Sequence, residues 1–247
     1  MRVLLTQCGR RIVHGFAYEK RRCVNKFLAI SVLVGSSCLG GAAHAQLSGS
    51  IAVMSLYKTR GIDQDNRNRD AAPALQASLR YDWSNGLYVG NWSSTGRFGR
   101  GRLETDWFGG YVGKLSDDLS YDVGYVQYYY PNEHTWNSGA VYGGVSYQGA
   151  NLYVYWGTRE DVNRDDIYVH FTYKRPITER LHWTLGLGHM AYGPYGYRDK
   201  WDASIGLEYL LQEKLVLSLQ VQGANRRSDV SHGERNTRVI AGLRMDF

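Results

Sequence analysis

The chain ends in VIAGLRMDF, residues 239–247, and this stretch indicates the fold class more directly than any other. Apolar side chains stand at every second position, namely Val239, Ala241, Leu243, Met245 and Phe247. A period of two residues predicts a β-strand with one apolar face, because successive side chains of a strand point to opposite sides.

An amphipathic last strand that ends in an aromatic residue is similar to the signal read by the outer-membrane assembly machinery of Gram-negative bacteria. A terminal Phe is common by chance, but it seldom follows such an alternating strand. We therefore expect the same five alternating residues, ending at Phe247, to form that signal, and we expect the assembly machinery to be a partner of this chain.

The same alternation recurs upstream in segments of about 10 residues, the length that a tilted strand needs to cross a membrane. In one of them Ile167, Val169 and Phe171 alternate with Tyr168 and His170. Twelve such segments predict strands at residues 48–57, 74–82, 87–95, 103–113, 119–129, 138–147, 151–157, 166–174, 181–190, 201–210, 215–223 and 237–247.

The connections between these segments alternate strictly between short and long. Five short ones lie at 83–86, 114–118, 148–150, 175–180 and 211–214, and six longer polar ones lie at 58–73, 96–102, 130–137, 158–165, 191–200 and 224–236. A barrel with periplasmic turns and extracellular loops requires this alternation, and a spanning sheet must close because lipid cannot hydrogen-bond its edges. The sequence predicts an all-β, membrane-spanning, antiparallel up-and-down β-barrel of twelve strands in the outer membrane of a Gram-negative bacterium.

Aromatic residues gather near the ends of the expected strands, as they do in the interfacial girdles of membrane barrels. The members are Trp83, Trp92, Trp107, Tyr147, Trp156, Trp183 and Trp201. The alternative is that these rings fill the core of a water-soluble β-protein.

Residues 1–45 have the parts of a cleaved secretory signal peptide. Positive residues lie at 21–26, an apolar stretch begins at Phe27, and Ala43-His44-Ala45 places small side chains at the −3 and −1 positions of a peptidase site. We expect cleavage after Ala45 and a mature barrel over residues 46–247. An uncleaved membrane helix is the alternative, but the apolar stretch is shorter than the roughly 20 residues that a span needs.

The leader also accounts for the positive charge of the chain. The whole chain has 29 Lys and Arg against 23 Asp and Glu, for a net charge of +6. The leader holds seven of the basic residues and one of the acidic ones, which leaves 22 of each in residues 46–247. A neutral mature chain gives no reason to expect a nucleic-acid partner. Because Cys8, Cys23 and Cys38 also lie in the leader, we expect no disulfide and no Cys-based metal site in the mature chain.

The inward positions of the expected strands combine small residues with charged ones. We expect the pore lining to include Arg80, Glu104, Asp106, Asp122, His170, Lys174, Asp202, Glu208, Arg238 and Arg244. Charges of both signs inside a barrel need water or one another, because unpaired burial is costly. The favoured function is that of a porin, through whose narrow water-filled lumen small polar solutes or ions diffuse passively. The alternative is a non-conducting structural or interaction barrel with a salt-bridged interior.

An outer-membrane lipid hydrolase is a further alternative, since some barrels of this size are enzymes. His189 is the best candidate base, but its expected neighbours Ala203, Ile167 and Val169 offer no serine nucleophile. We therefore expect no enzyme and no catalytic residue. The other histidines lack the spacing of metal ligands, so we expect neither a metal nor a cofactor.

The expected partners beyond the assembly machinery are membrane components and small polar solutes. Outer-membrane lipid surrounds the apolar face of such a barrel. Arg97, Arg100 and Arg102 share one expected outer loop, where they are either solvated or in contact with the phosphates of lipopolysaccharide.

Residues 57–147 resemble the TorF-type porin family, whose domain is called Gcw_chp. The resemblance rests on YKTRGI (57–62), PALQ (73–76), GLYVGNW (86–92), ETDWFGGY (104–111), LSYDVG (119–124) and VYGGVSY (141–147). It implies a small outer-membrane barrel that acts as a channel, without implying a substrate. The family pattern has an acid before Tyr57, where this chain has Leu56, so no role for that acid carries over.

Overall fold

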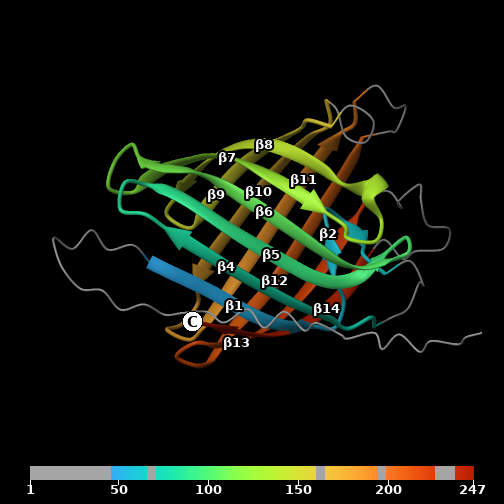
Figure 1. Ribbon diagram of the computed structural model, residues 1–247. Coiled ribbons are helices and arrows are strands. Elements are labelled where there is room, and N and C mark those ends of the chain that lie inside the picture. The colour runs from blue at the N-terminus through green and yellow to red at the C-terminus, as the bar shows by residue number, and fades with distance from the viewer. Residues whose placement is uncertain (1–45, 66–70, 160–164, 194–198, 226–236) are drawn as a thin grey trace, which may run out of the picture. The chain divides into compact units, whose positions relative to one another are not determined.

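The computed structural model describes residues 46–65, 71–159, 165–193, 199–225 and 237–247, and it confirms a closed antiparallel barrel of twelve strands (Figure 1). The expected signal peptide and its cleavage site lie outside the described residues. The barrel strands are β1 (Gln46–Met54), β4 (Ala74–Asp82), β5 (Leu87–Phe98), β6 (Gly101–Lys114), β7 (Leu119–Tyr129), β8 (Ser138–Tyr147), β9 (Ala150–Gly157), β10 (Ile167–Pro176), β11 (Leu181–Ala191), β12 (Lys200–Gln212), β13 (Leu215–Ala224) and β14 (Thr237–Asp246). From β4 to β14 each strand pairs with its neighbours in sequence, and β1 closes the barrel between β14 and β4.

Two short strands, β2 (Lys58–Thr59) and β3 (Ile62–Asp63), pair with each other outside the barrel sheet. A single turn of 3-10 helix, η1 (His134–Trp136), lies in the connection between β7 and β8. Within the described ranges, no helix has both the length and the apolar character to cross a membrane.

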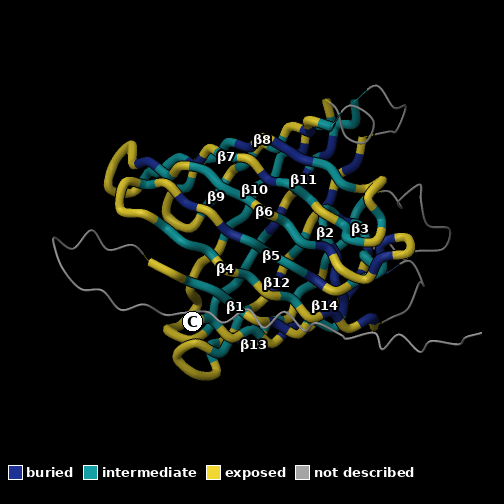
Figure 2. The backbone as a smooth tube through the Cα atoms, viewed as in Figure 1, coloured by how far each residue is buried: buried dark blue, intermediate teal, exposed yellow. Residues whose placement is uncertain are grey.

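Exposure alternates along the strands as the two-residue period predicts (Figure 2). On β14, Val239 is 63% exposed and Met245 is 51% exposed, while Ile240 between them is 1% exposed. Large apolar side chains such as Ile51, Leu79 and Leu219 are likewise exposed on the outer face. A sheet with this apolar outer face and a polar inner face matches a barrel whose outside contacts hydrocarbon.

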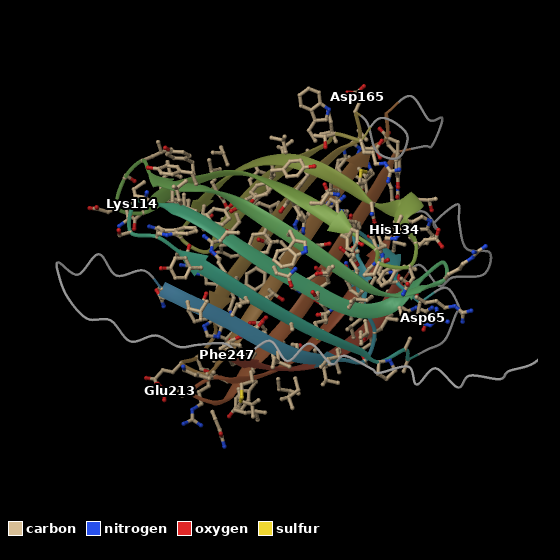
Figure 3. The ribbon with its side chains drawn as sticks, in the orientation of Figure 1. Asp65, Lys114, His134, Asp165, Glu213 and Phe247 are labelled. Atoms are coloured by element: carbon tan, nitrogen blue, oxygen red, sulfur yellow. The ribbon has the colours of Figure 1, made fainter. Side chains whose placement is uncertain are left out.

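Short turns and longer connections lie at opposite ends of the barrel. Lys114, Glu213 and Phe247 mark the turn end, and Asp65, His134 and Asp165 mark the loop end (Figure 3). The structure corrects one of the long loops expected at this end. Residues 96–102 largely extend β5 and β6, which meet through Gly99 and Arg100 alone, so Arg97 and Arg102 lie on strands. The pairing is irregular between Thr95 and Phe98, which explains why the alternation there failed to predict strand.

The structure also corrects the expected end of the first strand. The expected strand at 48–57 stops at Met54, and the chain then leaves the sheet. Residues 55–65, called the inward segment below, do not extend outward as part of a loop over 58–73. Their side chains pack inside the barrel, where Leu56 is 2% exposed and packs with Ala72 and Ile240.

The C-terminal residue is part of the barrel closure. Phe247 donates its N–H to the Gly49 carbonyl at 3.0 Å and accepts a hydrogen bond from the Gly49 N–H at 3.1 Å. A Cβ on Gly49 would lie 2.7 Å from two ring carbons of Phe247, so only glycine leaves room for this ring on β1. The terminal aromatic ring is therefore seated on the strand that closes the barrel.

Deletion of Phe247 is expected to lower the amount of folded, heat-modifiable protein in outer membranes, while periplasmic or degraded protein increases. The deletion removes the terminal ring of the expected assembly signal and two backbone hydrogen bonds to β1. Semi-native gel electrophoresis of membrane fractions measures this, with Phe247→Tyr as the control that keeps an aromatic ring. Normal assembly of the deletion variant would show that the terminus is not read in this way.

Candidate functional site: the lumen and its inward segment

The inward segment is built around a two-residue hairpin turn. Lys58 pairs with Asp63 and Thr59 with Ile62, which leaves Arg60 and Gly61 as the turn residues. Both have positive φ, 48° and 73°. Hairpin turns of this kind favour Asn-Gly, because residues with a Cβ are strained there. Arg60 therefore stands where a local preference would place Asn.

A buried ion triad ties this hairpin to the barrel wall. Asp63 accepts a hydrogen bond from Lys58 Nζ at 2.6 Å and another from Arg238 Nε of β14 at 2.7 Å. The side chains of Lys58, Asp63 and Arg238 are 1%, 1% and 4% exposed. Such buried charges are tolerable only because each cation is paired with the shared carboxylate.

Arg60 reaches across the lumen to the opposite wall. Its Nη2 donates to the Tyr128 hydroxyl of β7 at 2.7 Å. Its Cζ lies 4.7 Å from the ring centroid of Tyr168 on β10, and 5.5 Å from those of Tyr128 and Tyr155. A desolvated guanidinium among aromatic faces is attracted by about 2 kcal/mol or more. The hairpin is thus held at its tip as well as at its base.

The rest of the inward segment also contacts distant strands. A Cβ on Gly61 would lie 2.6 Å from Cβ of Ala224 on β13, so glycine is needed for this close approach as well as for the turn. On the return, Arg97 of β5 donates its N–H to the Gln64 carbonyl at 2.8 Å. The segment therefore runs from β1 across the lumen and back to β5, near the loop end (Figure 2).

A chamber of about 700 Å³ lies inside the barrel beside this segment. Its wall is formed by residues of every strand from β4 to β13, together with Lys58, Thr59 and Arg60. The basic and acidic side chains on the wall are Lys58, Arg60, Arg80, Asp106, Asp122, Lys174, Asp202 and Glu208. The wall therefore carries four basic and four acidic side chains.

The chamber is closed to different degrees at its two ends. Near the turn end, Arg80 pairs with Asp82 and Lys174 pairs with Glu208 at 2.6 and 2.5 Å, and Lys174 remains 47% exposed. At the other end the Lys58–Asp63 pair is 1% exposed on both sides. Water reaches the turn-end charges, and the inward segment covers the loop end.

Tyrosines dominate one side of the chamber, over β7 to β10. Tyr142, Tyr153, Tyr155 and Tyr168 follow one another with ring centroids 5.5–6.3 Å apart, and Tyr168 stacks on His170 at 5.5 Å. Two of their hydroxyl groups donate hydrogen bonds to carboxylates of the chamber wall. Tyr153 donates to Asp122 Oδ2 at 2.9 Å, and Tyr168 donates to Asp202 Oδ2 at 3.2 Å. The opposite wall contributes the side chains of Ser204, Gln220 and Gln222.

Two carboxylates of β6 lie beside the base of the inward segment. Glu104 Oε1 accepts from the Tyr130 hydroxyl at 2.6 Å, and Tyr57 also hydrogen-bonds to Glu104. Burial, followed by the charges of Glu104 and Asp106, raises the pKa of Tyr57 well above its ordinary value, so its phenol stays a neutral donor. Glu104 Oε2 and Asp106 Oδ1 have no hydrogen-bond donor among the residues that the structure describes.

Successive cavities share wall residues on either side of the inward segment. A second cavity of about 350 Å³ shares Lys58, Thr59, Trp92, Asp106 and Gln220 with the chamber. A third, of about 190 Å³, shares Tyr57 with the second and is lined by Gln64, Asp65 and Arg102. These cavities therefore adjoin one another along the segment, and Asp106 lines both the chamber and the second cavity.

The predicted pore-lining residues all stand on the lumen parity of their strands, but they are not equivalent. The chamber wall includes Arg80, Asp106, Asp122, His170, Lys174, Asp202 and Glu208. Glu104 and Arg238 are instead buried beside the inward segment. Arg244 lies near the turn end, where its Nε donates to Asp246 at 2.9 Å. Whether these residues face a conducting pore stays a prediction.

Sequence reasoning missed the residues that come from the inward segment. The sequence pattern predicts an outer loop for Lys58, Arg60 and Asp63. However, a basic residue before Thr59-Arg60-Gly61-Ile62 and an acid after it form a pattern that fits a small hairpin. Sequence reasoning also failed to group the chamber tyrosines, Tyr142, Tyr153, Tyr155 and Tyr168, which are called the tyrosine wall below. Trp92, expected in an outer girdle, lies in the lumen, with its ring 5.3 Å from that of Tyr57.

On the outer face, no serine of the described strands is paired with His189, the candidate base. His189 is paired directly with Val169 and Trp201, and neither position holds a serine. Its Nε2 lies 3.6 Å from Asp199 Oδ2. Among the residues that the structure describes, no three His, Cys, Asp or Glu side chains come together in a group able to hold a metal ion.

Comparison with known proteins relates the chain to one family and to several porin structures. The model of the family described as "Bacterial protein of unknown function (Gcw_chp)" matches residues 39–242. No curated protein matches the sequence. The fold is similar to that of the KdgM porin, with 11% identity, a TM-score of 0.56, and coverage of 81% of this chain and 99% of that one. It is also similar to the NanC porin, with 14% identity, a TM-score of 0.54, and coverage of 81% and 98%. At these identities the likeness concerns the fold.

Proposed function

Since the chain belongs to the Gcw_chp family, whose function is described as unknown, we propose from its own lumen that it is a narrow outer-membrane channel for small polar solutes or ions. The observation that carries this proposal is the set of adjoining cavities within a closed barrel, bordered by both acidic and basic side chains. The channel role that the TorF-type resemblance implies is part of this proposal.

The membrane location is proposed on the same basis as the fold. An exposed apolar band on every strand needs lipid around it, and the two structures with which the fold was compared are porins. We place the turn end in the periplasm and the loop end outside, with Arg100 and Arg102 exposed there toward lipopolysaccharide. The assembly machinery remains the proposed partner of β14.

The inward segment is the proposed constriction. It occupies the lumen near the loop end, and the cavities pass it beside Asp106. A solute that passes beside Asp106 would meet its carboxyl group there, so the charge of the solute affects its passage. Overall balance of the wall charges should keep ion selectivity weak.

A non-conducting barrel is the second candidate, and one observation favours it. The buried Lys58–Asp63–Arg238 triad holds the inward segment firmly enough to act as a plug. Both readings place the same residues in the lumen, so a measurement of conductance is what separates them.

Purified protein in planar bilayers is expected to give small, discrete conductance steps, and Asp106→Lys is expected to shift selectivity toward anions. The substitution places a base where an acid stands between the chamber and the second cavity, in a confined space. Reversal potentials under a salt gradient measure the shift. Asp118→Lys is the matched control, because it makes the same charge change in an exposed turn, where salt screens charges over about 8 Å.

Two results would count against this proposal in different ways. Absence of conductance from well-folded protein would favour the plug. Conductance that persists with the same selectivity in Asp106→Lys would mean that the route does not pass Asp106.

A further inference from the structure

We propose that Arg60 binds the carboxylate group of a small solute that carries a flat or hydroxylated ring, and that the tyrosine wall stacks against the ring. This inference deepens the proposed channel function by naming a solute class and the residue that recognises it. It rests on the position of Arg60 in the chamber, on its free donors, and on what surrounds it.

Among the described lysines and arginines of the chamber wall, Arg60 is the one that forms no ion pair. Three other bases of the wall are paired, Lys58 with Asp63, Arg80 with Asp82, and Lys174 with Glu208. Arg60 has no ion pair with any carboxylate of the described residues, and its one hydrogen bond goes to the neutral hydroxyl of Tyr128.

The remaining donors of Arg60 are open to the chamber. A guanidinium has five N–H groups, and its planar edge matches the two oxygens of a carboxylate. The nitrogens of Arg60 are not among the fully buried polar atoms that lack a partner in the described residues, and the side chain lines the chamber. An anion in the chamber can therefore reach them.

The backbone holds Arg60 in a conformation that a side chain ordinarily avoids. A positive φ at a residue other than glycine costs about 1–3 kcal/mol and is commonest where the surroundings enforce it. The Lys58–Asp63 pair and the contact of Gly61 with Ala224 enforce it here. This turn directs the Arg60 side chain from the tip of the hairpin into the lumen, where its guanidinium reaches Tyr128 and Tyr168.

The surroundings of Arg60 specify a ring next to the carboxylate. The rings of Tyr155 and Tyr168 flank the guanidinium, so a carboxylate on its free edge would carry its substituent along the tyrosine wall. Aromatic faces stack on flat rings and on the C–H faces of sugars, and Gln220 and Gln222 opposite can hydrogen-bond hydroxyl groups. A chamber of about 700 Å³ has the size of a site for a small ligand.

Benzoate and glucuronate are the probes of the two ring types, with acetate, glucose and benzylamine as comparisons. Each is titrated into the folded barrel by calorimetry in detergent, and its block of single-channel current is recorded in bilayers. At least one ring-bearing acid is expected to bind and to block the current at a concentration about tenfold lower than acetate, glucose or benzylamine needs. Acetate lacks the ring, and glucose and benzylamine lack the carboxylate. Each therefore loses the ring contact or a charged hydrogen bond, which is worth about this factor.

Arg60→Gln and Arg60→Lys are both expected to raise the dissociation constant of the ring-bearing acid about tenfold, because Lys keeps the charge but loses the two-pronged edge. Arg60→Lys also serves if Arg60→Gln does not fold, which heat modifiability on gels reveals. Arg180→Gln is the control, since Arg180 is exposed in the turn between β10 and β11 and does not line the chamber.

Unchanged affinity in folded Arg60→Gln or Arg60→Lys would overturn the inference, as would tighter binding of benzylamine than of both ring-bearing acids. Calorimetry keeps this test separate from the channel proposal. Binding that depends on Arg60 without any conductance would leave the inference standing and refute the channel, and conductance without such binding would do the reverse.

Discussion

Replacement of residues 57–63 by glycine and serine at unchanged length is expected to raise single-channel conductance several-fold. The substitution removes Arg60 from the tyrosine wall and Lys58 and Asp63 from the triad, so the hairpin loses the side-chain contacts that hold it across the lumen. The barrel strands keep all their pairing, because β2 and β3 form no ladder with them. Planar-bilayer recordings measure the change.

The control for this experiment is the same kind of replacement in the turn at 115–118, at the opposite end of the barrel. That variant should conduct like the unchanged protein. If the replacement at 57–63 folds and also leaves conductance unchanged, the inward segment is not the constriction. A non-conducting protein that begins to conduct after the replacement would identify the segment as a plug.

Asp63→Asn is expected to release the inward segment while the barrel stays closed. It leaves Lys58 buried without the counter-charge of Asp63 and takes a carboxylate partner away from Arg238, and breaking a buried pair in this way costs about 3–5 kcal/mol. Detachment of an eleven-residue segment into water relieves that cost without breaking any pairing of the barrel strands, so local release is favoured over unfolding.

A single cysteine can report this release, because the three cysteines of the chain lie in the leader, before residue 46. Leu56 is 2% exposed, so Leu56→Cys in a protein comprising residues 46–247 should react slowly with maleimide. Adding Asp63→Asn should make the reaction many times faster. Adding Asp82→Asn instead should not, because the Arg80–Asp82 pair is already about one-third exposed and contributes little. Equal labelling rates in the two double variants would contradict the release.

The buried triad and the Arg60 contacts differ in what they can do. Asp63 forms ion pairs with Lys58 and Arg238, which water does not reach. Its role is therefore to hold the segment in place. Arg60 faces a chamber wall with free donors, so it can exchange tyrosine contacts for a solute. The same short hairpin therefore combines an anchor at its base with a recognition group at its tip.

The sequence by itself determined the twelve strands and which side chains of each strand face inward. Both follow from local alternation, since a strand that crosses lipid must separate apolar from polar residues along its whole length. Even here, irregular pairing between Thr95 and Phe98 hid the ends of β5 and β6. The C-terminal residues 239–247 are the clearest case, because their exposure alternates as their composition does.

Only the tertiary structure decided the path of residues 55–65. The partners that draw this segment inward are far away in the chain, since Asp63 and Arg238 are 175 positions apart and Arg60 and Tyr128 are 68 apart. No local period encodes such contacts, and a polar stretch between two strands looks the same whether it enters the lumen or projects into water. Closure of the barrel brings β14 and β7 within reach of the hairpin, and buried charges then stabilise the inward path because they can pair there.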